Sequence, residues 1–168
     1  MAPTIMPRRL KHSAMHCFAN FENTVSVTGT LIRVFGNPVC WISKRQNKVA
    51  RNTTEAELIA MSSTADELMW VKKLLVDLGY VLYRPKLWAD NQSANHVAAN
   101  RLSSHRTKSL DVKDLSVQGF HEREELFVDW VSTKDQMADI LTKVLPGPAT
   151  KSFCIKLHLS ACSVSPKS

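Results

Sequence analysis

A long run of apolar residues at helical spacing constrains what this chain can fold into more than any other feature. The run begins at Leu58 and ends at Leu78. Thr54 before it and Gly79 after it are residue types that favour the start and the end of a helix. The pattern predicts one long helix, from about residue 54 to residue 78, with a single buried face. Its apolar positions are Leu58, Met61, Ala65, Leu68, Met69, Val71, Leu74, Leu75 and Leu78.

Strand patterns lie on both sides of the predicted helix. Residues 25–35 are rich in β-branched and aromatic types, and residues 39–42 resume this pattern after a turn signal, so the two segments form a hairpin. A buried helix face needs a partner surface, and we therefore expect one sheet with the helix packed across it. The predicted strands of that sheet lie near residues 26–35, 38–43, 86–89 and 126–131.

Shorter helices complete the predicted order of elements, near residues 91–100, 110–121 and 135–145. Together with the strands they give the order β-β-α-β-α-α-β-α, which is typical of a mixed α/β domain with a parallel component. The length of 168 residues suits a single domain.

The balance of charge favours a polyanionic partner. Lys and Arg number 22 against 15 Asp and Glu, a net charge of +7, and released counterions contribute to the binding of a basic protein to nucleic acid. No apolar run reaches the roughly 18 residues that a membrane span needs. We therefore expect no membrane partner, no signal peptide and an intracellular location, cytoplasmic or nuclear. The oligomeric state is left open.

Three acids, Glu57, Asp90 and Asp139, lie where apolar runs meet helix ends. Acids far apart in sequence can converge into a site for hard cations, and two Mg²⁺ ions about 4 Å apart promote in-line cleavage of a phosphodiester. Simpler interpretations exist. Glu57 is placed to favour a helix dipole, and Asp90 is placed to cap the helix that follows it. The residues alone leave both interpretations open.

Six short segments carry a resemblance to one family. They are residues 26–29 (SVTG), 37–46 (NPVCWISKRQ), 53–60 (TTEAELIA), 89–94 (ADNQSA), 105–108 (HRTK) and 135–143 (DQMADILTK). In this order and spacing they resemble the RNase H region of Copia-type LTR retrotransposon Pol polyproteins. The resemblance extends from about residue 18 to residue 148, which is most of the chain.

The resemblance implies an RNase H-like α/β fold, with a five-stranded mixed sheet flanked by helices. It also implies an endonuclease, a hydrolase that cuts the RNA strand of RNA–DNA hybrids with two Mg²⁺ ions and no other cofactor. Glu57, Asp90 and Asp139 match the catalytic and metal-binding acids of the family. Glu55 is the alternative for the glutamate and fits the family segment less well.

A basic stretch follows the helix predicted at residues 91–100. His105, Arg106 and Lys108 in this stretch are the candidate nucleic-acid-binding residues, because basic side chains there can meet phosphates. A solvated basic loop is the other interpretation, and the residues leave it open.

The chain departs from the family where the first catalytic acid is expected. The family has Asp-Ala-Asp before a triplet such as Phe-Ala-Asn, and here Met15, His16 and Cys17 precede that triplet. Met15 therefore takes the place of the aspartate that bridges both metals in the family. Thiolate and imidazole ligands do not replace a bridging carboxylate on Mg²⁺. We expect at most one bound Mg²⁺ and weak or absent hydrolysis.

Two further departures are Ser109 and Leu115, at places where the family commonly has histidine. No polymerase region precedes the RNase H-like segment, so we expect a truncated and degenerate relative. Residues 1–14 are expected to be disordered or unrelated, 15–148 to form the RNase H-like domain, and 149–168 to form a C-terminal tail. The alternative function is a non-catalytic nucleic-acid-binding relic, or a remnant polyprotein fragment without selected function.

Overall fold

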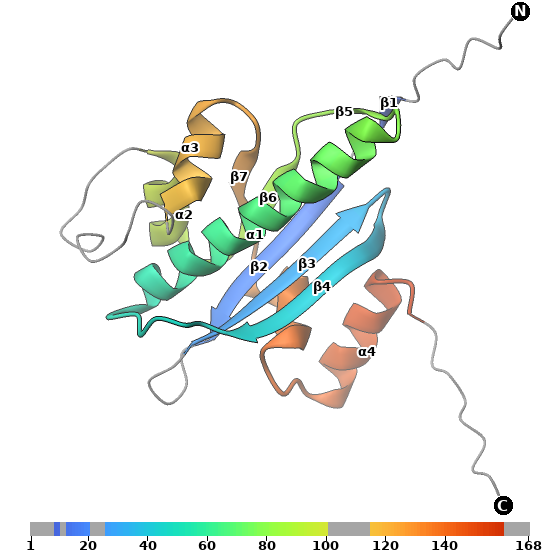
Figure 1. The fold of residues 1–168 in the computed structure, drawn as a ribbon. Helices are drawn as coiled ribbons and strands as arrows, with labels where there is room; N and C mark the ends of the chain where they lie inside the picture. Colours follow the sequence, from blue (N-terminus) through green and yellow to red (C-terminus); the bar gives the residue numbers. More distant parts are fainter. Residues whose placement is uncertain (1–8, 11–12, 21–25, 101–114, 160–168) are drawn as a thin grey trace, which may run out of the picture.

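A computed structural model of the protein describes residues 9–10, 13–20, 26–100 and 115–159, the first two segments as backbone (Figure 1). The strands are β1 (Arg9–Leu10), β2 (Ser13–Asn20), β3 (Val27–Val34), β4 (Asn37–Arg45), β5 (Val81–Leu82), β6 (Lys86–Ala89) and β7 (Phe127–Trp130). The α-helices are α1 (Thr53–Asp77), α2 (Gln92–Ala99), α3 (Ser116–Glu122) and α4 (Gly147–Lys156). Two 3₁₀ helices are η2 (Thr133–Asp135) and η3 (Met137–Leu141).

The main sheet has five strands in the order β4-β3-β2-β6-β7. β2, β3 and β4 are antiparallel neighbours, whereas β6 runs parallel to β2 and β7 runs parallel to β6 (Figure 1). The predicted five-stranded mixed sheet is confirmed, with all four of the predicted strands in it. β1 and β5 form a separate, two-stranded parallel ladder.

α1 covers one face of the main sheet, as its sequence pattern predicts. The predicted buried face is wrong at its C-terminal end, where Leu74 is 44% and Leu78 is 65% exposed. Asn52 caps the start of α1, because Asn52 Oδ1 accepts a hydrogen bond from the Glu55 N–H at 2.9 Å. Gly79 follows its end with a φ of +85°, in the left-handed region that glycine enters without strain. Neither α1 nor any other helix in the described segments is long and apolar enough to cross a membrane. The core between α1, α2, α3 and the sheet includes Ile32, Leu58, Met61, Leu68, Leu87, Val97 and Val117.

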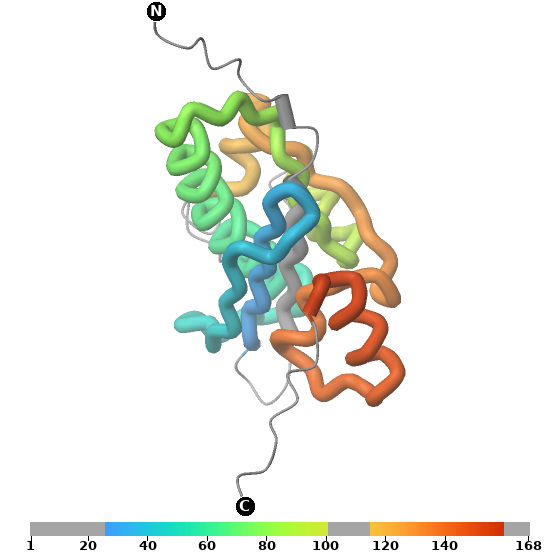
Figure 2. Tube along the Cα trace, turned by 90° about the vertical axis from the view of Figure 1, so that its right-hand side faces the viewer, coloured from blue at the N-terminus to red at the C-terminus, as the bar shows by residue number. Residues whose placement is uncertain are grey.

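A second, smaller core lies on the opposite face of the sheet. Leu31 precedes Ile32 on β3 and faces the other way, since successive side chains of a strand alternate. It packs with Phe153 and Leu157 from the C-terminal part of the chain. Figure 2 shows the strands between α1 on one side and α4 on the other. The segment that we expected to be a tail from residue 149 therefore includes most of α4, packed against the sheet.

The segment near residues 135–145 differs from the single helix that its sequence predicts. It contains η2 and η3, which are separated by Gln136 with a ψ of 94°. A residue with this extended ψ cannot continue a helical turn. The Gln136 side chain is fully buried, so the position that breaks the helix is anchored in the interior.

Candidate functional site

Asp90 directly follows β6, at the edge of the sheet where the parallel strands β2 and β6 have their carboxyl ends. Open α/β sheets place their sites at this edge. Asp90 Oδ2 accepts a hydrogen bond from Thr133 Oγ1 at 3.0 Å. The cap of α2 is Asn91, whose Oδ1 accepts a hydrogen bond from the Ala94 N–H at 3.0 Å. Asn91 therefore performs the capping role that the sequence left open for Asp90.

Asp139 is a buried carboxylate on η3, with a relative exposure of 4%. Its Oδ2 forms an ion pair with Lys143 Nζ at 3.1 Å. Its Oδ1 is also buried and accepts no hydrogen bond within the described part of the chain. A buried polar atom of this kind is costly to leave unsatisfied, and it marks a place where a cation or water molecule can bind.

Gly29 on β3 allows η3 to approach the sheet closely. A Cβ atom at this position would lie 2.6 Å from Thr142 Cγ2 and 3.0 Å from the Ala138 carbonyl oxygen. Ser43 of β4 holds the same segment, because its Oγ donates a hydrogen bond to the Leu141 carbonyl at 2.7 Å. These contacts fix the position of η3 and, with it, the position of Asp139.

The pKa of Asp139 is raised above its ordinary value, chiefly by burial, which disfavours the charged carboxylate. The hydrogen bond and the positive charge of Lys143 lower this pKa, and the negative charge of Asp90 raises it. The effect of Asp90 means that the fold brings the carboxylates of Asp90 and Asp139 within electrostatic range of each other.

Glu57 is the fifth residue of α1, at the beginning of its second turn, and its side chain is 4% exposed. The role at the helix start belongs to Glu55, whose Oε2 accepts a hydrogen bond from the Arg51 N–H at 2.8 Å. In the described segments, no group of three or more His, Cys, Asp or Glu side chains is arranged to hold a metal ion. The pair of Asp90 and Asp139 is thus what the structure brings together, and convergence of Glu57 with that pair stays a prediction.

Met15 lies on β2, the middle strand of the sheet. Its backbone pairs with Ile32 of β3 and with Leu87 of β6. Leu87 precedes Asp90 by three residues, which corresponds to about 10 Å along a strand. The strand that should carry the first acid of the family is therefore beside the strand that ends at Asp90.

His105, Arg106 and Lys108, the candidate nucleic-acid-binding residues, lie outside the described residues. Sequence reasoning missed two side chains that contact the acids, Lys143 and Thr133. Lys143 had a signal, because it follows Asp139 at the i, i+4 spacing of a local ion pair. Thr133 had none, because its contact with Asp90 joins distant parts of the chain.

We expect Lys143→Met to raise the pKa of Asp139 further, because the two effects that lower it come from Lys143. A carbon-detected NMR titration of the Asp139 carboxyl group measures this change. The matched control is Lys156→Met, which removes the ion pair of an exposed acid, Asp135, and should leave Asp139 unchanged. An unchanged Asp139 titration in Lys143→Met would contradict the assigned ion pair.

The same raised pKa fixes a pH dependence of stability. The folded-state pKa of Asp139 lies above the ordinary value of 3.8, so the folded chain binds more protons than the unfolded chain between these two values. The contribution of Asp139 to the free energy of unfolding is therefore fully present below pH 3.8 and is lost as the pH rises through the folded-state pKa.

Comparisons with known proteins place the chain among polyproteins of mobile elements. It is 38% identical over 127 residues to the retrovirus-related Pol polyprotein from transposon TNT 1-94 of Nicotiana tabacum, covering 76% of this chain and 10% of that protein. It is 34% identical over 140 residues to the corresponding polyprotein from transposon RE1 of Arabidopsis thaliana, covering 83% and 10%. The chain thus spans about a tenth of the length of these relatives. No family model matches it.

Solved structures with a similar fold are RNase H proteins. An RNase H1 isolated from compost by a metagenomic approach has a TM-score of 0.62 at 15% identity, covering 78% of this chain and 92% of that one. The N-terminal RNase H domain of a Mycobacterium tuberculosis protein has a TM-score of 0.54 at 13% identity, covering 86% and 96%. At these identities the likeness concerns the fold alone.

Proposed function

The chain is homologous to the Pol polyproteins of Copia-type retrotransposons and has the RNase H-like fold, and from this premise we propose that it is a nucleic-acid-binding domain whose hydrolysis of RNA–DNA hybrids is weak or absent. The parent activity is two-metal hydrolysis of the RNA strand, carried by Glu57, Asp90 and Asp139 together with a first aspartate. The impairment follows from Met15 at the place of that aspartate.

The observation that supports this proposal is a pair of interacting acids, one of which directly follows β6. Asp90 and Asp139 interact electrostatically, and the neighbouring central strand β2 carries Met15. Even with Glu57, the three carboxylates carry a charge of −3, which is less than the charge of +4 that two Mg²⁺ ions bring. The ions then repel each other, and one of them binds weakly or not at all.

The donor atoms fit Mg²⁺ in kind but do not fit a pair of ions in number. Carboxylate oxygens are the ligands that this hard cation prefers, and Asp139 Oδ1 is buried without a hydrogen bond in the described chain. The other oxygen of Asp139 is held by Lys143. Asp90, Asp139 and Glu57 would hold a single ion at most. A bound ion would supply charge stabilisation at a phosphate.

Nucleic acid is the proposed partner because the chain is basic and its fold is that of RNase H proteins. The net charge of +7 favours binding to polyanions through counterion release. We assign phosphate contacts to His105, Arg106 and Lys108 as a working hypothesis. Such contacts position a strand without reading its sequence.

We expect the full chain to bind a fluorescent RNA–DNA hybrid at about 50 mM salt, with an affinity that falls roughly tenfold or more by 200 mM, since each phosphate contact releases counterions. Fluorescence anisotropy measures this, and a second hybrid of unrelated sequence should bind equally. With Mg²⁺ added, a gel assay should show little or no cleavage.

The binding measurement and the cleavage assay test different parts of the proposal. Absence of hybrid binding at low salt would contradict the nucleic-acid role and favour a remnant without selected function. Efficient Mg²⁺-dependent cleavage by the unmodified chain would contradict the proposed impairment while leaving the nucleic-acid role intact.

A further inference from the structure

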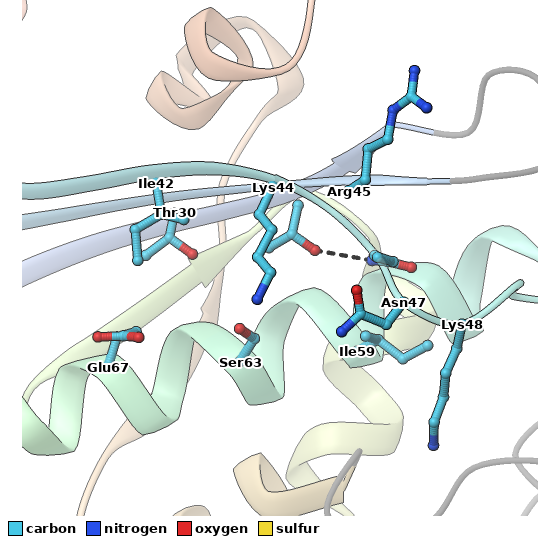
Figure 3. A pocket seen from close by; sticks show the side chains of 11 residues that line it. Thr30, Ile42, Lys44, Arg45, Asn47, Lys48, Ile59, Ser63 and Glu67 are labelled. Atoms are coloured by element: carbon cyan, nitrogen blue, oxygen red, sulfur yellow. Dashed lines mark hydrogen bonds between the residues drawn. The ribbon is translucent and has the colours of Figure 1, made fainter.

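A cleft of about 430 Å³ lies between α1 and the end of β4 (Figure 3). Its volume is in the range of small-ligand pockets, which hold about 300–1,000 Å³. β4 is an edge strand, and β3 and β2 separate it from β6. At about 4.8 Å per strand, the cleft is therefore about 14 Å across the sheet from the strand that ends at Asp90.

Lys44 is the charged side chain aimed into this cleft. Figure 3 shows it extending from β4 toward α1, whereas Arg45, the next residue, points the opposite way. The alternation of side chains along a strand explains the difference. The Lys44 ammonium makes no hydrogen bond or ion pair with any residue in the described part of the chain.

Other donors that line the cleft are likewise uncommitted within the described segments, namely the Ser63 hydroxyl and the Asn47 amide. Two other polar side chains of the cleft, Thr30 and Gln46, are already paired. Thr30 Oγ1 and Thr64 Oγ1 form a hydrogen bond of 2.7 Å, and Gln46 Nε2 donates to Thr28 Oγ1 at 3.0 Å. The cleft therefore offers an ammonium, a hydroxyl and an amide to a ligand that accepts hydrogen bonds.

The charge around the cleft is positive overall. Lys44, Arg45 and Lys48 lie in or beside it within one short segment, and Glu67 on α1 is the acid that lines it. Figure 3 places Glu67 beyond Ser63 along α1, so the acid lies toward one end of the cleft. An anionic ligand with several oxygens suits this arrangement, and a phosphate group has both the charge and the acceptors.

We propose that this cleft binds a phosphate group of a nucleic-acid strand, with Lys44 as the ion-pair partner and Ser63 and Asn47 as hydrogen-bond donors. The proposal rests on the nucleic-acid role argued above and adds a second contact region to it. One strand advances about 3.4 Å along the axis per nucleotide. A strand that passes Asp90 can thus reach a site about 14 Å away within about four nucleotides.

The test compares Lys44→Gln with Arg45→Gln in the full chain, by anisotropy with an RNA–DNA hybrid over a range of salt. Both changes remove one positive charge from neighbouring positions of β4 that line the cleft, and of the two side chains only that of Lys44 extends toward α1. Lys44→Gln should weaken binding by about five- to twentyfold at low salt and reduce the slope of log affinity against log salt by about 1. Arg45→Gln should stay within about twofold of the unmodified chain.

A third variant tests the opposite direction. Glu67→Gln removes the acid of the cleft and should strengthen hybrid binding by about two- to fivefold, because a repulsive charge is lost. Circular dichroism of each variant verifies that the fold is retained. Equal losses in Lys44→Gln and Arg45→Gln would overturn the proposal, since they would reflect general surface charge.

A titration with inorganic phosphate separates this proposal from the proposed function. Amide signals of Lys44, Asn47 and Ser63 should shift in NMR spectra of the unmodified chain and should not shift in Lys44→Gln. Such shifts without any hybrid binding would leave a phosphate site and overturn its assignment to a nucleic-acid strand. If these residues show no shift while hybrid binding is intact, the proposed phosphate site in the cleft is contradicted and the nucleic-acid role is not.

Discussion

Met15→Asp is expected to give this protein Mg²⁺-dependent cleavage of the RNA strand of a hybrid, at least about a thousandfold faster than the unmodified chain. The size of the effect follows from restoring a carboxylate to a site that must offset two divalent cations, comparable with regaining a major electrostatic term of catalysis. The position is supported by the fold, because β2 is the middle strand and runs parallel to β6, after which Asp90 follows.

Gel analysis of a labelled hybrid measures the gain. Met15→Asp combined with Asp90→Asn should lose it again, since both acids would serve one site. Cys17→Asp is the informative comparison, because the family has a second aspartate there and residue 17 lies two positions further toward the end of β2. Cleavage by Cys17→Asp alone would contradict the assignment to residue 15. Absence of cleavage in both Met15→Asp and Cys17→Asp would contradict a decayed two-metal site.

Leu58→Ala is expected to lower the free energy of unfolding by about 2–5 kcal/mol, the cost of a cavity at a fully buried leucine. Leu58 is 0% exposed, and it packs in the core between α1 and the sheet. It also follows Glu57 directly, so its loss loosens the part of α1 that positions this acid. Urea denaturation followed by circular dichroism measures the change.

The matched control for this prediction is Leu74→Ala on the same helix. Leu74 is 44% exposed, so its truncation removes little buried surface and should cost less than about 1 kcal/mol. Equal losses in the two variants would contradict the assignment of the buried face of α1. The difference between them, rather than either value alone, tests the packing.

The long helix and the strands could be predicted because their signals are local and repeat along the sequence. The apolar run after Thr54 fixed α1, and the turn between β3 and β4 marked the hairpin. The break at Gln136 could not be predicted, because its side chain is buried by tertiary packing that the local pattern does not show. The docking of α4 was missed for a related reason: its partner Leu31 lies more than a hundred positions earlier.

Of the candidate site, the sequence predicted where Asp90 lies in the fold but not how its neighbours are arranged. Sequence placed Asp90 after a strand, and the structure confirms that place. Whether Asp90 or Asn91 caps α2 could not be decided in advance, because both side chains suit an N-cap and neighbours compete for one position. The raised pKa of Asp139 depends on burial, which the sequence pattern around it does not specify.

The central position of β2 has a consequence for how the chain reaches its native state. One neighbour of β2, β3, begins at residue 27, whereas its other neighbour, β6, begins at residue 86. At a synthesis rate of about 5–20 residues per second, the 65 residues between β2 and β6 take about 3–13 s to appear. During that interval one side of β2 is an open edge, and pairings between segments so distant in sequence form slowly. Nascent chains that stop before β6 should therefore be the ones that aggregate or recruit chaperones.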